Sequence, residues 1–371
     1  MENFKVAHTD SKDLNSAVKS IKEQLSNIDS SLILFFASPV YQPEEVSKEM
    51  AKTFSGVRTV GCTTAGEMIS NKMGKDSIVA MAWSKNTLKD LKIEILEDIQ
   101  NDNNAVSKAF KSFEKTLGKS MQQLDPERYV GIVLIDGLSK CEEKINDQLG
   151  NLTNVPFVGG SAGDNFSFTD TWLFVDGKAY TNAALLVLLE PTNGYTILKT
   201  QSFLTTDKKL TPTKVDEKNR AVIEFNGKPA SIAYAETIGV TMAQLPDSFH
   251  KNPLGLVFDE NNFFVRSPMK IEGTSIIFYC SIKEGLELTV LRSDDIIPTT
   301  KKDMDNKIKN CKGITAIVDF NCCLRALELN QKNQTKEYSE LFANVPAIGF
   351  ATYGESYIGH INQTSTMLLL K

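Results

Sequence analysis

A short motif bounded by glycines occurs three times in this chain of 371 residues, and it constrains the fold more than any other feature. The copies read VGCTTAGE at residues 60–67, VGGSAGD at residues 158–164 and IGFATYGE at residues 348–355. Each copy ends in a carboxylate. Because a motif that recurs at long intervals indicates a repeated structural unit, we expect three related units.

The same pattern of segments surrounds each copy of the motif. An apolar run precedes each copy, at residues 32–36, 130–135 and 314–318, and a segment with helical spacing follows that run. A second apolar run follows each motif, at residues 78–83, 183–189 and 366–370. Continuous apolar runs are typical of strands that are buried on both faces. The sequence therefore predicts a mixed α/β fold, built by duplication of strand, helix, glycine turn and strand.

The segment between the second and third units has a different pattern. From residue 195 to residue 291, short apolar runs alternate with polar residues and are separated by turn pairs such as Asn226-Gly227 and Glu284-Gly285. This pattern predicts antiparallel hairpins, interrupted by one helix near residues 229–238. We therefore expect two domains: an α/β domain at residues 25–215 and an α+β domain at residues 216–371 with this β-rich insertion.

Composition excludes several classes of protein. With 41 Lys and Arg against 46 Asp and Glu, the net charge of −5 argues against binding to nucleic acid. The sequence has neither a signal peptide nor an apolar run long enough to span a membrane, so it predicts a cytoplasmic protein without membrane insertion. Six cysteines without a C-x-x-C pair favour free thiols over disulfides or structural zinc.

The glycine turns are the first candidate binding feature. Glycine lets a ligand approach the backbone N–H groups, and Thr63, Thr64 and Thr352 add hydroxyl donors. Glu67 and Glu355 are suited to holding a cationic group, whereas a phosphate cradle would require a Gly-Lys-Ser/Thr ending. Alternatively, the glycines only allow neighbouring strands to approach closely.

The second candidate feature is the stretch DFNCCLR at residues 319–325, which follows a predicted buried strand. We expect Asn321 to be the N-cap of a helix, with Cys322 in its first turn and Arg325 one turn further on. A helix N-terminus and an Arg together favour a bound carboxylate, and the same setting lowers the pKa of a thiol. Alternatively, the cysteine is a buried core residue and the Arg pairs with a structural carboxylate.

The third candidate feature is the segment GHINQT at residues 359–364. Alternation along a strand would place His360, Asn362 and Thr364 on one polar face that lines a pocket. Alternatively, this face belongs to a solvent-exposed edge strand. Neither an H-E-x-x-H zinc motif nor a G-x-G-x-x-G dinucleotide motif is present, and Cys322 with His360 matches no recognised catalytic motif. The sequence therefore predicts a protein that is not an enzyme.

With these motifs the chain resembles the FIST family, bacterial sensory modules that combine a FIST N-terminal and a FIST C-terminal domain. The resemblance extends over residues 25–371 and is carried by residues 61–67, 156–164, 349–355 and 360–364, together with Cys322 and Arg325. It implies a ligand-sensing input module for small molecules such as amino acids. It also implies an output through a histidine kinase, a cyclic-dinucleotide enzyme or a chemoreceptor, and because no such segment follows Lys371, we expect a separate partner protein.

Our first hypothesis is a sensor without a cofactor that binds an amino acid. Arg325 would hold the carboxylate, and Glu67 or Glu355 would hold the ammonium group. The candidate ligand-binding residues are Cys62, Thr63, Thr64, Glu67, Gly159, Gly160, Cys322, Arg325, Thr352, Tyr353, Glu355, Asn362 and Thr364.

Two alternatives remain open. Some members of the family resemble haem proteins that sense nitric oxide. A haem in this chain would need His360, His250 or a cysteine thiolate as its axial ligand. The other alternative is a thiol-dependent enzyme that uses Cys322.

Overall fold

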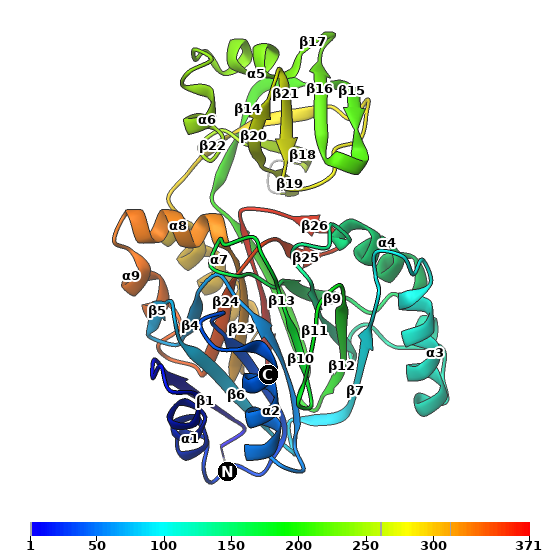
Figure 1. Ribbon diagram of the computed structural model, residues 1–371, viewed down its shortest axis with the longest axis vertical. Helices are drawn as coiled ribbons and strands as arrows, with labels where there is room; N and C mark the ends of the chain where they lie inside the picture. Colours follow the sequence, from blue (N-terminus) through cyan, green and yellow to red (C-terminus); the bar gives the residue numbers. More distant parts are fainter. Residues whose placement is uncertain (1, 260–261, 312) are drawn as a thin grey trace. The chain divides into compact units, whose positions relative to one another are not determined.

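The computed structural model describes residues 2–259, 262–311 and 313–371, and it shows a mixed α/β protein (Figure 1). The chain forms two compact units. The first comprises Met1–Lys199, Lys301–Gly359 and Ser365–Lys371, and the second comprises Thr200–Thr300 and His360–Thr364. The predicted fold class and the presence of two domains are thus confirmed. These units are defined by packing, and the predicted sequence boundary near residue 215 stays a prediction.

The first unit contains three sheets built to one plan. In each sheet an edge strand, an antiparallel strand and two parallel strands are followed by strands from another part of the chain. The first sheet has the order β1 (Phe4–Thr9), β6 (Ile78–Ser84), β2 (Ser30–Ala37), β3 (Arg58–Thr63), β10 (Leu173–Val175) and β11 (Lys178–Tyr180). The second has the order β7 (Leu88–Leu96), β12 (Ala184–Pro191), β8 (Val130–Ile135), β9 (Phe157–Ser161) and β25 (Glu355–Tyr357). The third has the order β13 (Tyr195–Gln201), β27 (Thr364–Leu370), β23 (Ala316–Cys322), β24 (Ala347–Thr352), β4 (Glu67–Ile69) and β5 (Lys72–Gly74).

Helices connect the two parallel strands of each sheet. The connections are α2 (Pro43–Thr53) in the first sheet, α4 (Glu142–Leu152) in the second, and α8 (Cys323–Gln331) with α9 (Thr335–Glu340) in the third. The remaining helices of this unit are α1 (Leu14–Gln24), α3 (Ala105–Leu117), the 3-10 turn η1 (Met121–Gln123) and most of α7 (Ile296–Asn310). The apolar runs on either side of each glycine motif therefore form neighbouring strands of one sheet.

The strand that follows each glycine motif joins the sheet of a different repeat. Strand β4 follows the first motif and pairs with β24 of the third repeat, whereas β25 follows the third motif and pairs with β9 of the second. Strand β10 follows the second motif and pairs with β3 of the first. The first repeat thus gives a strand to the third, the third gives one to the second, and the second gives one to the first. This exchange of strands is cyclic, and each sheet contains strands from two repeats.

The register of these pairs shows that Asp164, which ends the second motif, is not the structural counterpart of Glu67 and Glu355. Glu67 pairs with Phe350, Glu355 with Gly160, and Leu173 with Cys62. Leu173 thus occupies in the second repeat the position that a glutamate occupies in the other two. Asp164, the carboxylate that ends the second motif, lies in the loop before it.

The inner faces of the three sheets form one hydrophobic core. Phe36 of the first sheet lies 4.5 Å from Phe350 and 6.5 Å from Phe320 of the third, measured between ring centroids. The outer faces pack against helices, as Phe35 shows in the cluster formed with α1 and α2. The central strands, such as β6, β8, β12, β23 and β27, are therefore buried on both faces, which explains the continuous apolar runs.

The first glycine of each motif is required by close contact between parallel strands. A Cβ atom on Gly61 would lie 1.8 Å from the carbonyl oxygen of Phe35, and one on Gly159 would lie 1.7 Å from that of Val133. On Gly349 it would lie 2.4 Å from the Asp319 carbonyl oxygen. A side chain at these positions would force the strands apart.

The second unit consists mainly of antiparallel strands, as predicted. One sheet has the order β14 (Phe203–Leu210), β22 (Leu288–Ser293), β18 (Leu254–Asp259) and β19 (Asn262–Arg266). The other has the order β15 (Pro212–Asp216), β16 (Ala221–Phe225), β21 (Ser275–Phe278) and β20 (Pro268–Glu272), with β17 (Lys228–Pro229) beside β16. The smaller elements are η2 (Glu217–Asn219), α5 (Ala230–Ile238), α6 (Leu245–Ser248) and β26 (His360–Ile361).

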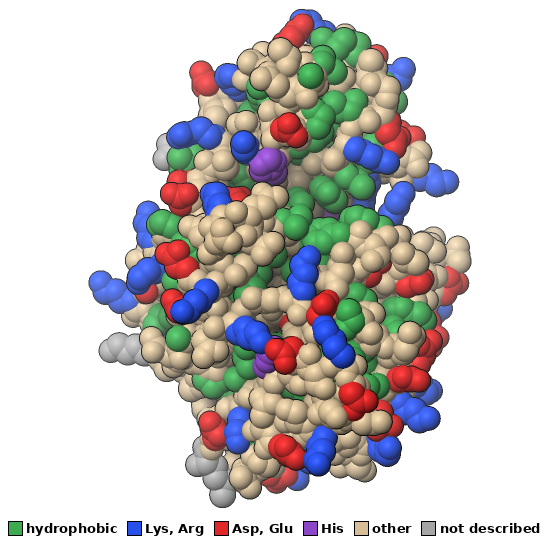
Figure 2. Space-filling model, turned by 60° about the vertical axis from the view of Figure 1, so that its left-hand side comes forward, with side chains coloured by type: hydrophobic (Ala, Val, Ile, Leu, Met, Phe, Trp, Pro, Cys, Tyr) green, Lys and Arg blue, Asp and Glu red, His purple; other side chains and the backbone are tan. Residues whose placement is uncertain are grey.

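Charged side chains of both signs are mixed over the face shown in Figure 2, which agrees with the small net charge. Among the described residues, none of the helices combines the length and the apolar character needed to cross a membrane.

Candidate functional site

The three glycine loops meet where the parallel strands end. One set of backbone hydrogen bonds repeats around the junction: the donor and acceptor pairs are Ala351 N to Gly66 O (2.7 Å), Ser161 N to Gly354 O (2.8 Å) and Thr63 N to Trp172 O (2.9 Å). A second set links Ala65 N to Ala351 O (3.1 Å), Tyr353 N to Ser161 O (3.2 Å) and Gly163 N to Thr63 O (3.0 Å). Because α/β proteins bind ligands at the carboxyl ends of their strands, this junction is the candidate site.

Two loops of the junction contain the same threonine–glutamate pair. The Thr64 hydroxyl donates to Glu67 Oε1, and the Thr352 hydroxyl donates to Glu355 Oε1 over 2.5 Å. Both carboxylates are buried. Glu67 Oε2 also accepts from the backbone N and the hydroxyl of Ser77, at 3.0 and 2.7 Å. Burial raises the pKa of Glu67 to about 7, even though these hydrogen bonds favour the charged form.

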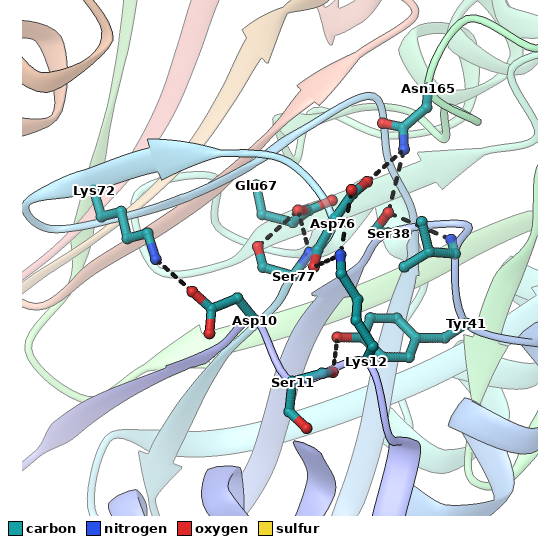
Figure 3. A network of polar contacts seen from close by, with 11 residues as sticks. Asp10, Ser11, Lys12, Ser38, Tyr41, Glu67, Lys72, Asp76, Ser77 and Asn165 are labelled. Carbon is teal, nitrogen blue, oxygen red and sulfur yellow. Dashed lines mark hydrogen bonds and ion pairs between the residues drawn. The ribbon is translucent and has the colours of Figure 1, made fainter. Parts of the chain in front are cut away.

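The contacts of Glu67 continue into a polar network, shown in Figure 3. Next to Ser77, the Asp76 carboxylate forms an ion pair with Lys12 at 3.2 Å. Asn165, from the loop of the second repeat, donates to Asp76 Oδ1 at 3.5 Å. The network therefore connects the loops of the first and second repeats through side chains as well as through the backbone.

A surface groove lies beside this network. Tyr41 and Lys12 line the groove, which has a volume of about 520 Å³ between the first turns of α1 and α2. The Tyr41 hydroxyl donates to the Ser11 carbonyl oxygen at 2.6 Å, and burial, with Glu67 and other carboxylates nearby, raises its pKa to about 12. Nothing in the spacing of Tyr41 and Lys12 along the sequence indicates that they lie near Glu67.

Tyr353 lies beneath the loop of the second repeat. Its hydroxyl donates to Asp164 Oδ1, and its ring stacks on Phe168 with centroids 5.2 Å apart. The Asp164 carboxylate also accepts from the backbone N of Phe168 (3.0 Å), Thr169 (2.6 Å) and Asp170 (3.2 Å). Asp164 thus fixes the loop, and the half-exposed ring of Phe168 covers Tyr353.

Arg325 lies in the first turn of α8 and is only 3% exposed. Its Nε donates to Asn321 Oδ1 at 3.0 Å, and its guanidinium lies 6.0 Å from the centre of the Tyr338 ring. The N-cap of the helix is Cys322 and not Asn321, which is still part of β23, so the predicted cap was one residue too early. Cys322 is buried, and its side chain forms no capping hydrogen bond.

A buried carboxylate lies near Arg325. Asp319 accepts from the hydroxyl of Tyr338 at 2.9 Å and from that of Ser365 at 2.6 Å. Burial raises the pKa of Asp319 to about 6, although the two hydrogen bonds and Arg325 favour its charged form. In strand register, Glu67 pairs with Phe350 and Phe350 with Phe320, so Glu67 lies on the sheet face opposite Asp319.

Three further candidate residues are tightly packed: Cys62, Gly159 and Gly160. Cys62 is fully buried in the inner core, and burial together with Glu67 raises the pKa of its thiol well above its usual value. A Cβ atom on Gly160 would lie 2.5 Å from Thr352 Cγ2, so this glycine lets the loops of the second and third repeats come together.

The predicted polar strand face at residues 360–364 does not form. Strand β26 ends at Ile361, Gln363 has a positive φ of 52°, and β27 begins at Thr364. The alternation that would align His360, Asn362 and Thr364 is therefore broken. All three side chains are buried, which excludes the alternative of a solvent-exposed edge strand.

The candidate haem ligands differ in their surroundings. His360 is 3% exposed, whereas His250 is exposed in the turn after α6. Among the described residues, no three His, Cys, Asp or Glu side chains are grouped so that they could hold a metal ion.

Comparison with known proteins identifies the two halves of the chain. The model of the FIST N domain matches residues 31–228, and that of the FIST C domain matches residues 230–357. An uncharacterized protein of Methanocaldococcus jannaschii is 23% identical over 369 aligned residues, covering 88% of this chain and 70% of the relative. The chain therefore belongs to the FIST family, whose domains are associated with sensory signal transduction.

Proposed function

We propose that this protein is a cytoplasmic, non-enzymatic sensor that binds an amino acid and passes the signal to a separate signalling protein. The family supports the sensory role. The partner would be a histidine kinase, a cyclic-dinucleotide enzyme or a chemoreceptor. No cofactor is needed for this function.

The buried guanidinium of Arg325 carries the proposal. It lies in the first turn of α8, which begins at the carboxyl end of the central strand β23. Helix N-termini favour anions, and Arg is suited to bidentate binding of a carboxylate. Both features favour an acidic small molecule, and amino acids belong to this class.

The remaining candidate residues divide into two groups. Thr64 and Glu67 bind each other, and the second oxygen of Glu67 is held by Ser77. We therefore assign this pair, and the corresponding pair Thr352 and Glu355, to holding the loops in place. The loop backbones around them would line the ligand.

A thermal-shift screen of the twenty amino acids tests the proposal. We expect at least one of them to raise the Tm, and Arg325→Ala to weaken its binding by about 1.5–3 kcal/mol, the contribution of a charge-assisted hydrogen bond. Arg58→Ala is the matched control, because Arg58 is exposed and pairs with Asp176 at 2.7 Å. Circular dichroism checks that each variant is folded. Unchanged binding by folded Arg325→Ala would remove Arg325 from the site, and a screen without any shift would contradict the amino-acid ligand.

A further inference from the structure

The three repeats can be compared position by position, and the third differs on the sheet face that its helices cover. Strand register places Phe35, Val133 and Asp319 at equivalent positions, each beside the first glycine of its motif. Two residues further along the same face, the equivalent residues are Ala37, Ile135 and Asn321. In the first two repeats all four side chains are apolar and fully buried. The third repeat places a carboxylate and an amide there.

This replacement is costly for folding. Burying a polar group is unfavourable unless its hydrogen bonds are satisfied, and burying a charge is more unfavourable still. Asp319 is fully buried and Asn321 is 2% exposed. Because the same architecture is stable with apolar residues at these positions, the polar pair is not required by the fold.

Asp319 and Asn321 both keep hydrogen-bonding capacity that no described residue uses. A carboxylate accepts up to about four hydrogen bonds, and Asp319 receives two, from Tyr338 and Ser365. The carbonyl oxygen of Asn321 accepts from Arg325 and, over 3.4 Å, from Tyr338. Its buried amide nitrogen has no hydrogen-bond partner among the described residues. The pair thus offers an acceptor and a donor on one strand face, about 6.6 Å apart along the strand.

We propose that Asp319 binds the ammonium group of the ligand and that Asn321 Nδ2 binds its carboxylate together with Arg325, so that the protein selects amino acids over acids without an amino group. This inference rests on the proposed function and names the residues that determine its specificity. On one side β24 presents the small residues Gly349 and Ala351 beside Asp319 and Asn321. On the other side β27 presents Met367 and Ser365.

Tyr338 is a positioning residue in this arrangement. It is fully buried, and its hydroxyl lies 2.9 Å from Asp319 Oδ2 and 3.4 Å from Asn321 Oδ1. It therefore fixes the separation between the acceptor and the donor without itself contacting the ligand.

Isothermal titration of paired ligands tests the inference. The pairs are L-alanine with pyruvate, L-glutamate with 2-oxoglutarate, L-leucine with 4-methyl-2-oxopentanoate, and L-phenylalanine with phenylpyruvate. The members of a pair share a carboxylate and a side chain and differ at the amino group. For any pair that binds, we expect the wild-type protein to bind the amino acid at least tenfold more tightly than the oxo acid.

Asp319→Asn should reduce this preference to less than about threefold, mainly by weakening binding of the amino acid. Asp176→Asn, at an exposed carboxylate that pairs with Arg58, should leave the preference unchanged.

Equal binding of both members of a pair by the wild-type protein overturns the inference, even if Asp319→Asn does not fold. If that binding is also lost in Arg325→Ala, the proposed amino-acid sensor with Arg325 in its site still stands. If no amino acid or oxo acid binds, both proposals fail.

Discussion

Gly61→Ala should destabilise the protein strongly, although it adds a single methyl group. The new Cβ atom would lie 1.8 Å from the carbonyl oxygen of Phe35 and 2.9 Å from its carbonyl carbon. Contacts of a Cβ atom below 3.0 Å are essentially never tolerated, and here the obstacle is backbone that cannot rotate away. Strands β2 and β3 must therefore move apart.

The size of the effect follows from two contributions. Overpacking a buried site costs typically about 1–3 kcal/mol. Separating the strands also weakens their shared hydrogen bonds, each of which contributes about 1 kcal/mol. We therefore expect a loss of about 3–5 kcal/mol, which lowers the Tm of a unit of this size by roughly 6–20 °C.

Differential scanning calorimetry of a matched series measures the effect. Gly159→Ala, with a closest approach of 1.7 Å, should resemble Gly61→Ala, and Gly349→Ala, with 2.4 Å, should be milder. Gly74→Ala is the control, because a Cβ atom there would meet no atom within 4 Å. If the Tm of Gly61→Ala lies within about 2 °C of that of Gly74→Ala, the explanation by strand contact is wrong, and the glycines serve ligand access instead.

Two further predictions concern titration and cofactor binding. The pKa of Glu67 is about 7 in the folded protein and 4.5 in the unfolded chain, so its contribution to stability is full below pH 4.5, declines as the pH rises to about 7 and is constant above that. Urea unfolding across this range should show a steeper decline in the wild-type protein than in Glu67→Gln, which keeps the decline that the raised pKa of Asp319 causes. Parallel curves would place the titration elsewhere. We also expect no stoichiometric Soret band after reconstitution with haem, because His250 is exposed in a turn and His360 is buried in the packed chain. A band that disappears in His360→Ala would replace the amino-acid sensor with a gas sensor.

The repeated architecture could be predicted from the sequence, because its signals are local. A buried strand is apolar along its whole length, and the runs at residues 32–36 and 130–135 both lie in such strands. The antiparallel character of the second unit could also be predicted, since alternation and turn pairs are features of neighbouring residues. The fold class therefore followed from composition and periodicity.

The arrangement of the candidate site could not be predicted in the same way. Asp319 and Tyr338 are 19 residues apart and lie in a strand and a later helix, so nothing in their spacing indicates that they form a hydrogen bond. The equivalence of Leu173 with Glu67 depends on strand register, and the different loop lengths of the repeats conceal it. Comparison of the three apolar strands would have provided one signal, because Asp319 is a carboxylate within an otherwise apolar run.

The cyclic exchange of strands determines how binding at one repeat reaches the others. Strand β24 pairs with β23, which leads into the helix of Arg325, and on its other side it pairs with β4 from the first repeat. A displacement of β24 on binding must therefore move β4 and Glu67, or break their hydrogen bonds. Glu67 in turn contacts Ser77, beside the network that includes the loop of the second repeat. Because every sheet contains a strand from another repeat, the proposed ligand, held by the third repeat, would disturb all three repeats, and the surface for the proposed signalling partner would not have to lie on the repeat that touches the ligand.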